Sequence, residues 1–232
     1  MCERHVAVPV GSAVQQAVNM DKAVKRSYRS PLRQAQAQMT RETVIEAAAR
    51  LFVERGYVAT SIDAVAGVAG VSRVTVFNAV GGKAALLKDA YDVAVIGDAE
   101  AVPLSERSWA HPVRDESDPM RMLDSYAGLV ADVCGRVSPL YEVLREAASA
   151  DTDVLQLWNE IQEERRGGMT DVVAVLADKG RLQEGLDLDT AADVLWVLTD
   201  PGLYHQLVHG RGWPPDRFTS WLSRSMVGQL LP

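Results

Sequence analysis

The stretch "AGVSRVTVFNAVGGKAALL", residues 69–87, decides the fold. Gly70 suits a tight turn, and Ser72 suits the N-cap of a short helix that runs to about Val80. Before this turn, residues 60–69 carry apolar side chains at helical spacing, and a Thr or Ser stands where the helix would begin. Two short helices joined by a glycine turn are typical of a helix-turn-helix.

The second of these helices has polar side chains on its outer face. Val71, Val76 and Val80 are expected to face inward, which leaves Arg73, Thr75, Phe77 and Asn78 outside. An element this narrow fits a DNA major groove. Arg73 can donate to guanine or phosphate, Thr75 can contact phosphate or a thymine methyl, and Asn78 can pair with an adenine edge.

A lysine follows at the start of the next helix. Lys83 comes after Gly81 and Gly82 and precedes the leucine-rich sequence "AALL". Backbone N–H groups and the helix dipole favour an anion at such a position. A DNA phosphate is therefore the expected partner of Lys83.

Residues 40–92 resemble the N-terminal DNA-binding domain of TetR-type transcriptional regulators. The segment reads "TRETVIEAAARLFVERGYVATSIDAVAGVAGVSRVTVFNAVGGKAALL" from Thr40 to Leu87. The resemblance rests on Ala47-Ala48, Leu51-Phe52, Arg55-Gly56-Tyr57, Thr60-Ser61, Ala69-Gly70-Val71-Ser72, Thr75-Val76-Phe77, Gly82-Lys83 and Leu86-Leu87. It implies these DNA contacts: Thr60, Ser61, Ser72, Arg73, Thr75, Phe77, Asn78 and Lys83.

Three positions depart from the pattern of that family. Phe77 stands where members usually carry a tyrosine that donates to a phosphate, so about 1 kcal/mol per contact would be lost. Ala79-Val80 replace the usual aromatic pair. Asp63 lies where many members place a basic residue, and its charge would repel phosphate. We expect DNA binding that is weaker at the backbone.

The remaining sequence predicts more helices and no strand, so the expected fold is all-α. Residues 98–118 are rich in Pro, Ser and Asp and are predicted to form a connection. The helices expected after it cover residues 119–136, 138–149, 151–179, 188–199, 201–209 and 214–231. Residues 1–38 are interpreted as a disordered basic arm, 39–92 as the helix-turn-helix domain, and 93–232 as a helical domain for effector binding and dimerisation.

Two functions of the C-terminal helices follow from the resemblance. The helices at 188–199 and 214–231 are expected to pair with their copies in a homodimer, which would require a pseudo-palindromic operator. The predicted dimer residues are Leu195, Trp196, Leu198, Phe218, Trp221, Leu222 and Met226. A pocket for a small-molecule effector is expected between the helices of residues 119–179. Its predicted lining is Met122, Tyr126, Tyr141, Trp158 and Met169. For both sets, a place in the core of one protomer is the alternative.

Charge is distributed unevenly along the chain. Although the net charge is −7, residues 1–92 hold 12 basic and 8 acidic side chains, and the rest holds 12 basic and 23 acidic ones. The front part therefore tolerates a polyanion better than the total suggests. No apolar run approaches the roughly 20 residues of a membrane span. Two distant cysteines, Cys2 and Cys134, favour a reducing compartment, so we expect a cytoplasmic protein.

The sequence offers little for catalysis or for a metal or other cofactor. "GGKA" lacks the upstream glycine, the Ser or Thr after lysine and the preceding strand of a P-loop. His205 and His209 have the spacing of a metal-binding helix but no third ligand. We therefore expect a regulator, most often a repressor in this architecture, and not an enzyme. A DNA-binding architectural protein without an effector, or a regulator that senses a partner protein, remains the alternative.

Overall fold

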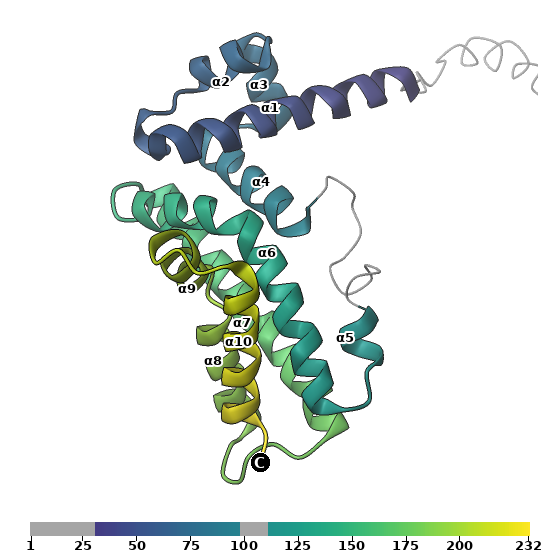
Figure 1. Ribbon diagram of the computed structural model, residues 1–232. Helices are drawn as coiled ribbons and strands as arrows, with labels where there is room; N and C mark the ends of the chain where they lie inside the picture. The colour runs from purple at the N-terminus through teal and green to yellow at the C-terminus, as the bar shows by residue number, and fades with distance from the viewer. Residues whose placement is uncertain (1–30, 98–110) are drawn as a thin grey trace, which may run out of the picture. The chain divides into compact units, whose positions relative to one another are not determined.

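The computed structural model describes residues 31–97 and 111–232 (Figure 1). Residues 1–30 of the predicted arm and residues 98–110 of the predicted connection lie outside the described part. Residues from Ala37 to Pro232 form one compact unit, and all contacts given below lie within it. The described residues are helices, turns and bends without a strand, which confirms the all-α prediction.

The first helix is longer than the sequence pattern predicts. Helix α1 covers Pro31–Ala59, whereas residues up to 38 were assigned to the arm. Proline is favoured in the first turn of a helix, and the following "LRQAQAQ" contains strong helix formers that need no apolar face. Residues 31–38 are therefore helical and do not belong to a disordered arm.

The helix-turn-helix has the predicted boundaries. Helix α2 covers Ile62–Ala69, α3 covers Arg73–Val80, and the two are bent by 100°. Ser61 and Ser72 cap them, each accepting a hydrogen bond of 3.1 Å from a backbone N–H of its helix. Gly70, with φ of 67°, supplies the left-handed turn between them. Helix α4, Lys83–Ile96, follows.

The chain leaves α1 through an unusual glycine. Gly56 has φ 76° and ψ 170°, a region that is essentially restricted to glycine. A Cβ atom there would meet no heavy atom within 4 Å, so only the backbone conformation opposes a side chain.

Gly56→Ala is therefore expected to lower the free energy of unfolding by about 1–3 kcal/mol. Gly67→Ala is the matched control, because Gly67 lies inside α2, also in open space and without a positive φ. It should raise the free energy of unfolding by about 0.5–1 kcal/mol. Urea unfolding measures the free energy of unfolding of both variants. A change in the same direction for both would contradict this account of Gly56.

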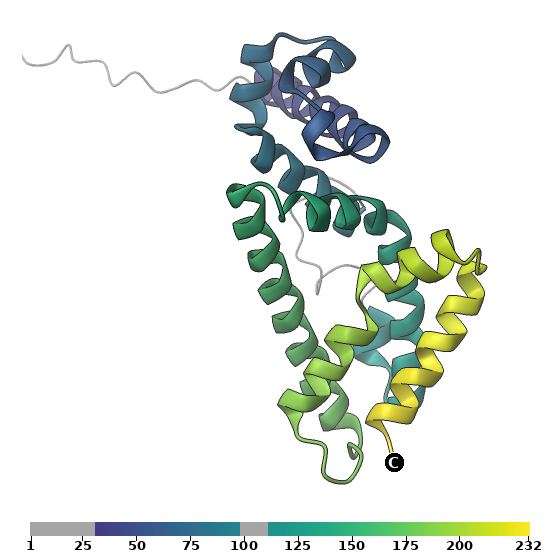
Figure 2. The same ribbon diagram turned by 90° about the vertical axis from the view of Figure 1, so that its left-hand side faces the viewer.

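Six further helical segments follow the gap (Figure 2). They are α5 His111–Asp115, α6 Pro119–Ala147, α7 Thr152–Lys179, α8 Leu188–Leu198, α9 Pro201–Tyr204 with the π-helix η3 His205–Gly210, and α10 Pro215–Leu230. The prediction of two helices at 119–136 and 138–149 was wrong, because α6 continues through Pro139. Proline removes one backbone hydrogen bond and bends a helix without having to end it. The ribbon of α6 is bent in both views.

Two apolar cores hold the described helices together. The first includes α1–α4 together with the later part of α6 and the first half of α7. The second includes the first part of α6, the end of α7, and α8–α10. Because α4 shares the first core with α6 and α7, the helix-turn-helix is packed directly on the C-terminal helices.

Among the described helices, none is by itself long and apolar enough for a membrane span, although α2 and α3 satisfy the length and composition criteria as a bent pair.

Candidate nucleic-acid interface and ligand cavity

The outer face of α3 presents four exposed side chains. Arg73, Val74, Phe77 and Asn78 are exposed, whereas Val76 is fully buried. Val74, which is 67% exposed, was not among the predicted contacts. The alternation of valines in "RVTVFNAV" gave no reason to place it outside. An exposed apolar side chain on this face is suited to a thymine methyl group.

Four hydroxyl residues of the predicted set form hydrogen bonds within the helix-turn-helix or the turn before it. Ser61 and Ser72 are exposed caps, and the hydroxyl of Thr75 lies 2.8 Å from that of Ser72. Thr60 is 1% exposed, and its hydroxyl donates to the carbonyls of Leu51 and Gly56 at 3.1 and 2.8 Å. The side chain of Thr60 therefore stabilises the turn after α1 and is not available to DNA, contrary to the prediction.

Arg73 is oriented by two neighbours. Its Nη1 atom lies 2.8 Å from Oδ2 of Asp63, and its guanidinium lies 5.6 Å from the ring centre of Phe77. Asp63 was expected only to repel phosphate. The ion pair adds a second effect, because it restricts the directions in which Arg73 can donate.

Asp63→Asn is expected to raise affinity for any duplex about three- to tenfold, because a negative charge near the phosphates is removed. Discrimination between the preferred and a scrambled duplex should fall, because Arg73 loses its orienting partner. Stability should change by less than about 1 kcal/mol, since both side chains are exposed. Fluorescence anisotropy with both duplexes measures these effects.

Glu46→Gln, which removes an exposed charge from α1 outside this pair, is the control. Equal loss of discrimination in both variants would show that net charge, and not the ion pair, is responsible.

Lys83 is the first residue of α4, the helix that follows α3 and leads toward the C-terminal helices. Its Nζ atom is 4.1 Å from the ring centre of Tyr57 and 3.4 Å from the carbonyl oxygen of Val58. Burial lowers the pKa of Lys83, and the carboxylate of Asp151 opposes this shift. Burial raises the pKa of Tyr57 to about 12, and the carboxylate of Asp151 adds to this rise. Asp151 caps α7, so the start of α7 acts electrostatically on Tyr57 and Lys83.

A cavity of about 670 Å³ lies between α4, α5, α6, α7 and the start of α9. Of the predicted lining, Met122, Tyr126 and Met169 do line it. Tyr141 and Trp158 do not; their rings pack 4.8 Å apart in the first core. The sequence showed which residues are apolar but not on which side of α6 and α7 the space lies.

Two polar residues of the cavity were missed from the sequence. Tyr91 reaches it from α4 and Arg165 from α7. Arg165 belongs to the charged sequence "EERR", which looks like a solvated helix face. Its side chain is only 14% exposed, so it cannot be identified from such a pattern.

Arg165 belongs to a network that joins three helices and the start of a fourth. Its Nη1 atom lies 3.2 Å from Asp200, and its Nη2 donates to the carbonyl of Trp196 at 3.0 Å. Asp200 caps α9 and accepts a hydrogen bond of 2.6 Å from Tyr141 of α6. The wall of the cavity is thus connected to the corner between α8 and α9.

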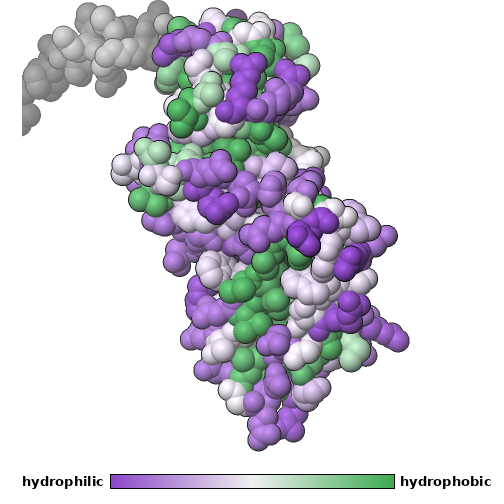
Figure 3. Space-filling view, turned by 60° about the vertical axis from the view of Figure 1, so that its left-hand side comes forward, coloured by the Kyte–Doolittle hydropathy of each residue, from purple (hydrophilic) through white to green (hydrophobic). Residues whose placement is uncertain are grey.

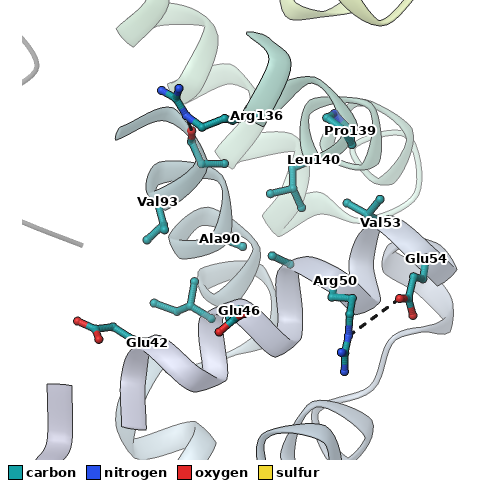
Figure 4. A pocket seen from close by; sticks show the side chains of 13 residues that line it. Glu42, Glu46, Arg50, Val53, Glu54, Ala90, Val93, Arg136, Pro139 and Leu140 are labelled. Atoms are coloured by element: carbon teal, nitrogen blue, oxygen red, sulfur yellow. Dashed lines mark hydrogen bonds and ion pairs between the residues drawn. The ribbon is translucent and has the colours of Figure 1, made fainter. Parts of the chain in front are cut away.

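A second hollow lies between α1, α4 and α6 (Figure 4). Glu42, Glu46 and Arg50 line it from α1, and Leu140 from α6. Arg136 of α6 also lines it and donates to the carbonyls of Ala94 and Val95 at 3.0 and 3.1 Å. These carbonyls belong to the last turn of α4, so Arg136 holds the end of α4 against α6.

Comparison with known proteins agrees with this geometry. Residues 44–90, which cover α2, α3 and parts of α1 and α4, match the family model described as bacterial regulatory proteins, tetR family. The helix-turn-helix part of the chain is therefore similar to the DNA-binding domain of that family. No match was found among curated proteins.

Solved structures of transcriptional regulators have the same fold over most of this chain. NalD of Pseudomonas aeruginosa, the secondary repressor of the MexAB-OprM multidrug efflux pump, is 23% identical, with a TM-score of 0.64 over 84% of this chain and 98% of its own. TylP, a TetR regulator from Streptomyces fradiae, is 19% identical, with a TM-score of 0.59 over 85% and 89%. A TetR transcriptional regulator from Chloroflexus aurantiacus is 18% identical, with a TM-score of 0.60 over 84% and 98%.

The protein has an apolar strip on the outer face of α8 and α10 (Figure 3). Trp196, Leu198 and Trp221 of the predicted dimer residues are half-buried on these helices. Val197 and Leu188, which were not predicted, are 53% and 51% exposed. The other predicted dimer residues were assigned wrongly, because they are fully buried in the second core of one protomer: Leu195, Phe218, Leu222 and Met226.

His205 and His209 lie in the π-helix, with ring centres 5.1 Å apart. Within residues 31–97 and 111–232, no group of three or more His, Cys, Asp or Glu side chains could hold a metal ion. His209 instead lies edge-on to the ring of Tyr204.

Proposed function

We propose that the protein is a ligand-responsive repressor that binds a pseudo-palindromic operator as a homodimer and is released by a small molecule. In this proposal residues 39–92 bind DNA, residues 93–232 bind the effector and dimerise, and the protein acts in the cytoplasm. The observation that carries the proposal is the exposed outer face of α3, where Arg73, Val74, Phe77 and Asn78 stand on a helix fixed by serine caps.

Each residue of this face has a distinct role in the proposal. Asn78 pairs with an adenine edge, Val74 contacts a thymine methyl, and Arg73 donates to guanine or phosphate. Phe77 packs beside Arg73 and has no hydroxyl with which to donate. Ser61, Ser72, Thr75 and Lys83 face backbone phosphates.

A single α3 buries too little surface for tight binding, so a second copy is needed. The exposed apolar strip of α8 and α10 supplies a surface for that copy. Trp196, Val197, Leu198 and Trp221 would then form the centre of a four-helix interface, with the fully buried residues behind them providing its support.

The cavity offers a place for the effector, and two contacts connect it to the DNA-binding helices. Helix α4 begins at Lys83 and contributes Tyr91 to the cavity. Helix α7 lines the cavity, and the charge of its capping residue Asp151 acts on Tyr57 and Lys83. A ligand that favours one spacing of the two α3 helices by about 3 kcal/mol would change operator occupancy roughly a hundredfold.

Selection of bound duplexes from a random pool tests this proposal. The expected result is a pseudo-palindrome whose half-sites lie about one helical turn apart or a multiple of it. Enrichment of a single non-symmetric site would contradict the homodimer. No enrichment at all would favour an architectural DNA-binding protein.

A further inference from the structure

The polar groups deep in the cavity are nearly all donors. Tyr91, Tyr126 and Arg165 line it from α4, α6 and α7, and both tyrosines are almost fully buried. Burial raises the pKa of both phenols, so both keep their protons at neutral pH. The positive charge of Arg165 opposes this rise in the pKa of both phenols.

Arg165 already donates to Asp200 and to the carbonyl of Trp196, whereas the two phenols have weaker partners within the protein. The hydroxyl of Tyr126 donates only to the thioether sulfur of Met169, at 3.3 Å, and sulfur is a weak acceptor. Among residues 31–97 and 111–232, no acceptor is found for the hydroxyl of Tyr91 or for Nε of Arg165. Neither of these atoms is fully buried, so each is open to water or to a ligand oxygen that can accept its hydrogen bond.

The carboxylates that line the cavity are placed differently. Asp92 and Glu164 lie 2.5 and 3.7 Å from the ammonium group of Lys88, and both have more exposed side chains than Arg165. The carboxylate of Asp171 is exposed, and so is the basic side chain of Arg114, which also lines the cavity. Asp200 forms an ion pair with Arg165 but does not itself line the cavity. The carboxylates of the lining are therefore more exposed than Arg165 and the two tyrosines, and Asp92 and Glu164 are paired with Lys88.

The remaining lining is a large apolar surface. It is formed mainly by aliphatic side chains of α4, α6 and α7, including Ile96, Leu129, Val133, Ile161, Val172 and Val175. The volume of about 670 Å³ is within the range of drug-sized ligands.

We propose that the effector is an amphipathic carboxylic acid, with its apolar body among the aliphatic side chains and its carboxylate held by Tyr91, Tyr126 and Arg165. This inference rests on the proposed function, because it assigns a ligand class to the effector cavity. The carboxylate also competes with Asp200 for Arg165 and draws Tyr91, on α4, toward α7. Both effects displace elements that the DNA-binding helices contact.

Binding of decanoate, decanol and decylammonium, which share one alkyl chain, tests the inference by isothermal titration calorimetry on the full-length protein. Decanoate is expected to bind at least tenfold more tightly than either of the others. Tyr91→Phe and Tyr126→Phe should each weaken decanoate about tenfold and leave decanol unchanged. Tyr204→Phe is the control, since Tyr204 is a buried tyrosine that does not line the cavity, and it should preserve the preference for the acid.

Equal binding of acid and alcohol, tighter binding of the amine, or no binding of any of the three would overturn the inference. So would a preference for the acid that both cavity variants retain. Operator binding is measured on the same samples. If decanol releases DNA as well as decanoate does, the proposed function stands and only the ligand class is wrong. If the protein prefers the acid but binds no duplex, the ligand class stands and the proposed function is wrong.

Discussion

Val197→Glu is expected to separate the proposed dimer and weaken operator binding roughly a thousandfold. Val197 projects from α8 with 53% of its surface exposed, so a glutamate there is solvated in the isolated protomer. In a symmetric interface the same substitution buries two unpaired carboxylates, which costs about 4 kcal/mol or more. The fold of the protomer should therefore persist while the assembly is lost. Analytical ultracentrifugation and anisotropy on the selected operator measure the two effects.

Leu155→Glu is the matched control for this variant. Leu155 is a partly exposed apolar residue of α7, at 44%, and it lies outside the strip of α8 and α10. It should remain dimeric with unchanged operator affinity. A Val197→Glu protein that stays dimeric and binds its operator normally would exclude this strip as the interface.

Asn78→Ala and Lys83→Ala are expected to impair DNA binding in two different ways. Asn78 is exposed on α3, and a bidentate contact to adenine is worth about 1–3 kcal/mol, so its loss in both half-sites amounts to about 2–6 kcal/mol. That loss should appear only on duplexes with the preferred base at one position of each half-site. Lys83→Ala should weaken binding to every duplex alike and reduce the slope of log K against log salt by about 2.

Titrations of both variants at several salt concentrations, on the selected operator and on single-base variants of it, distinguish these roles. Equal losses on all duplexes for both variants would contradict the assignment of Asn78 to a base. A salt slope that Lys83→Ala leaves unchanged would show that its contacts with Tyr57 and Val58 are structural only.

The helix-turn-helix could be predicted closely because its signals are local. Ser61, Gly70 and Ser72 determine caps and a turn within a few residues of themselves. The prediction of two helices in place of α6 was wrong for a related reason. Pro139 is a local signal for a break, but the packing of both halves of α6 into the cores outweighs this signal.

The cavity and the dimer face depend on which side of a helix meets which neighbour. Phe218, Leu222 and Met226 have the apolar spacing of an interface and of a core, and only the packing of α10 on α6 assigns them to the core. Arg165 shows the reverse error: it is charged and looks solvent-exposed in the sequence, but its ion pair with Asp200, 35 positions later, keeps it largely buried. Such pairs are separated too far in sequence for periodicity to reveal them.

The central claim is that two copies of α3 read the DNA symmetrically, and affinity cleavage tests it directly. Val74→Cys in a Cys2→Ser background places an iron–EDTA reagent on the outer face of α3, while burial raises the pKa of the Cys134 thiol to about 12 and keeps it unreactive. The account predicts cleavage of the selected duplex at two positions related by its dyad, and none when the reagent is on Ser149→Cys instead. Cleavage at one position only, or equal cleavage from both cysteines, would contradict it.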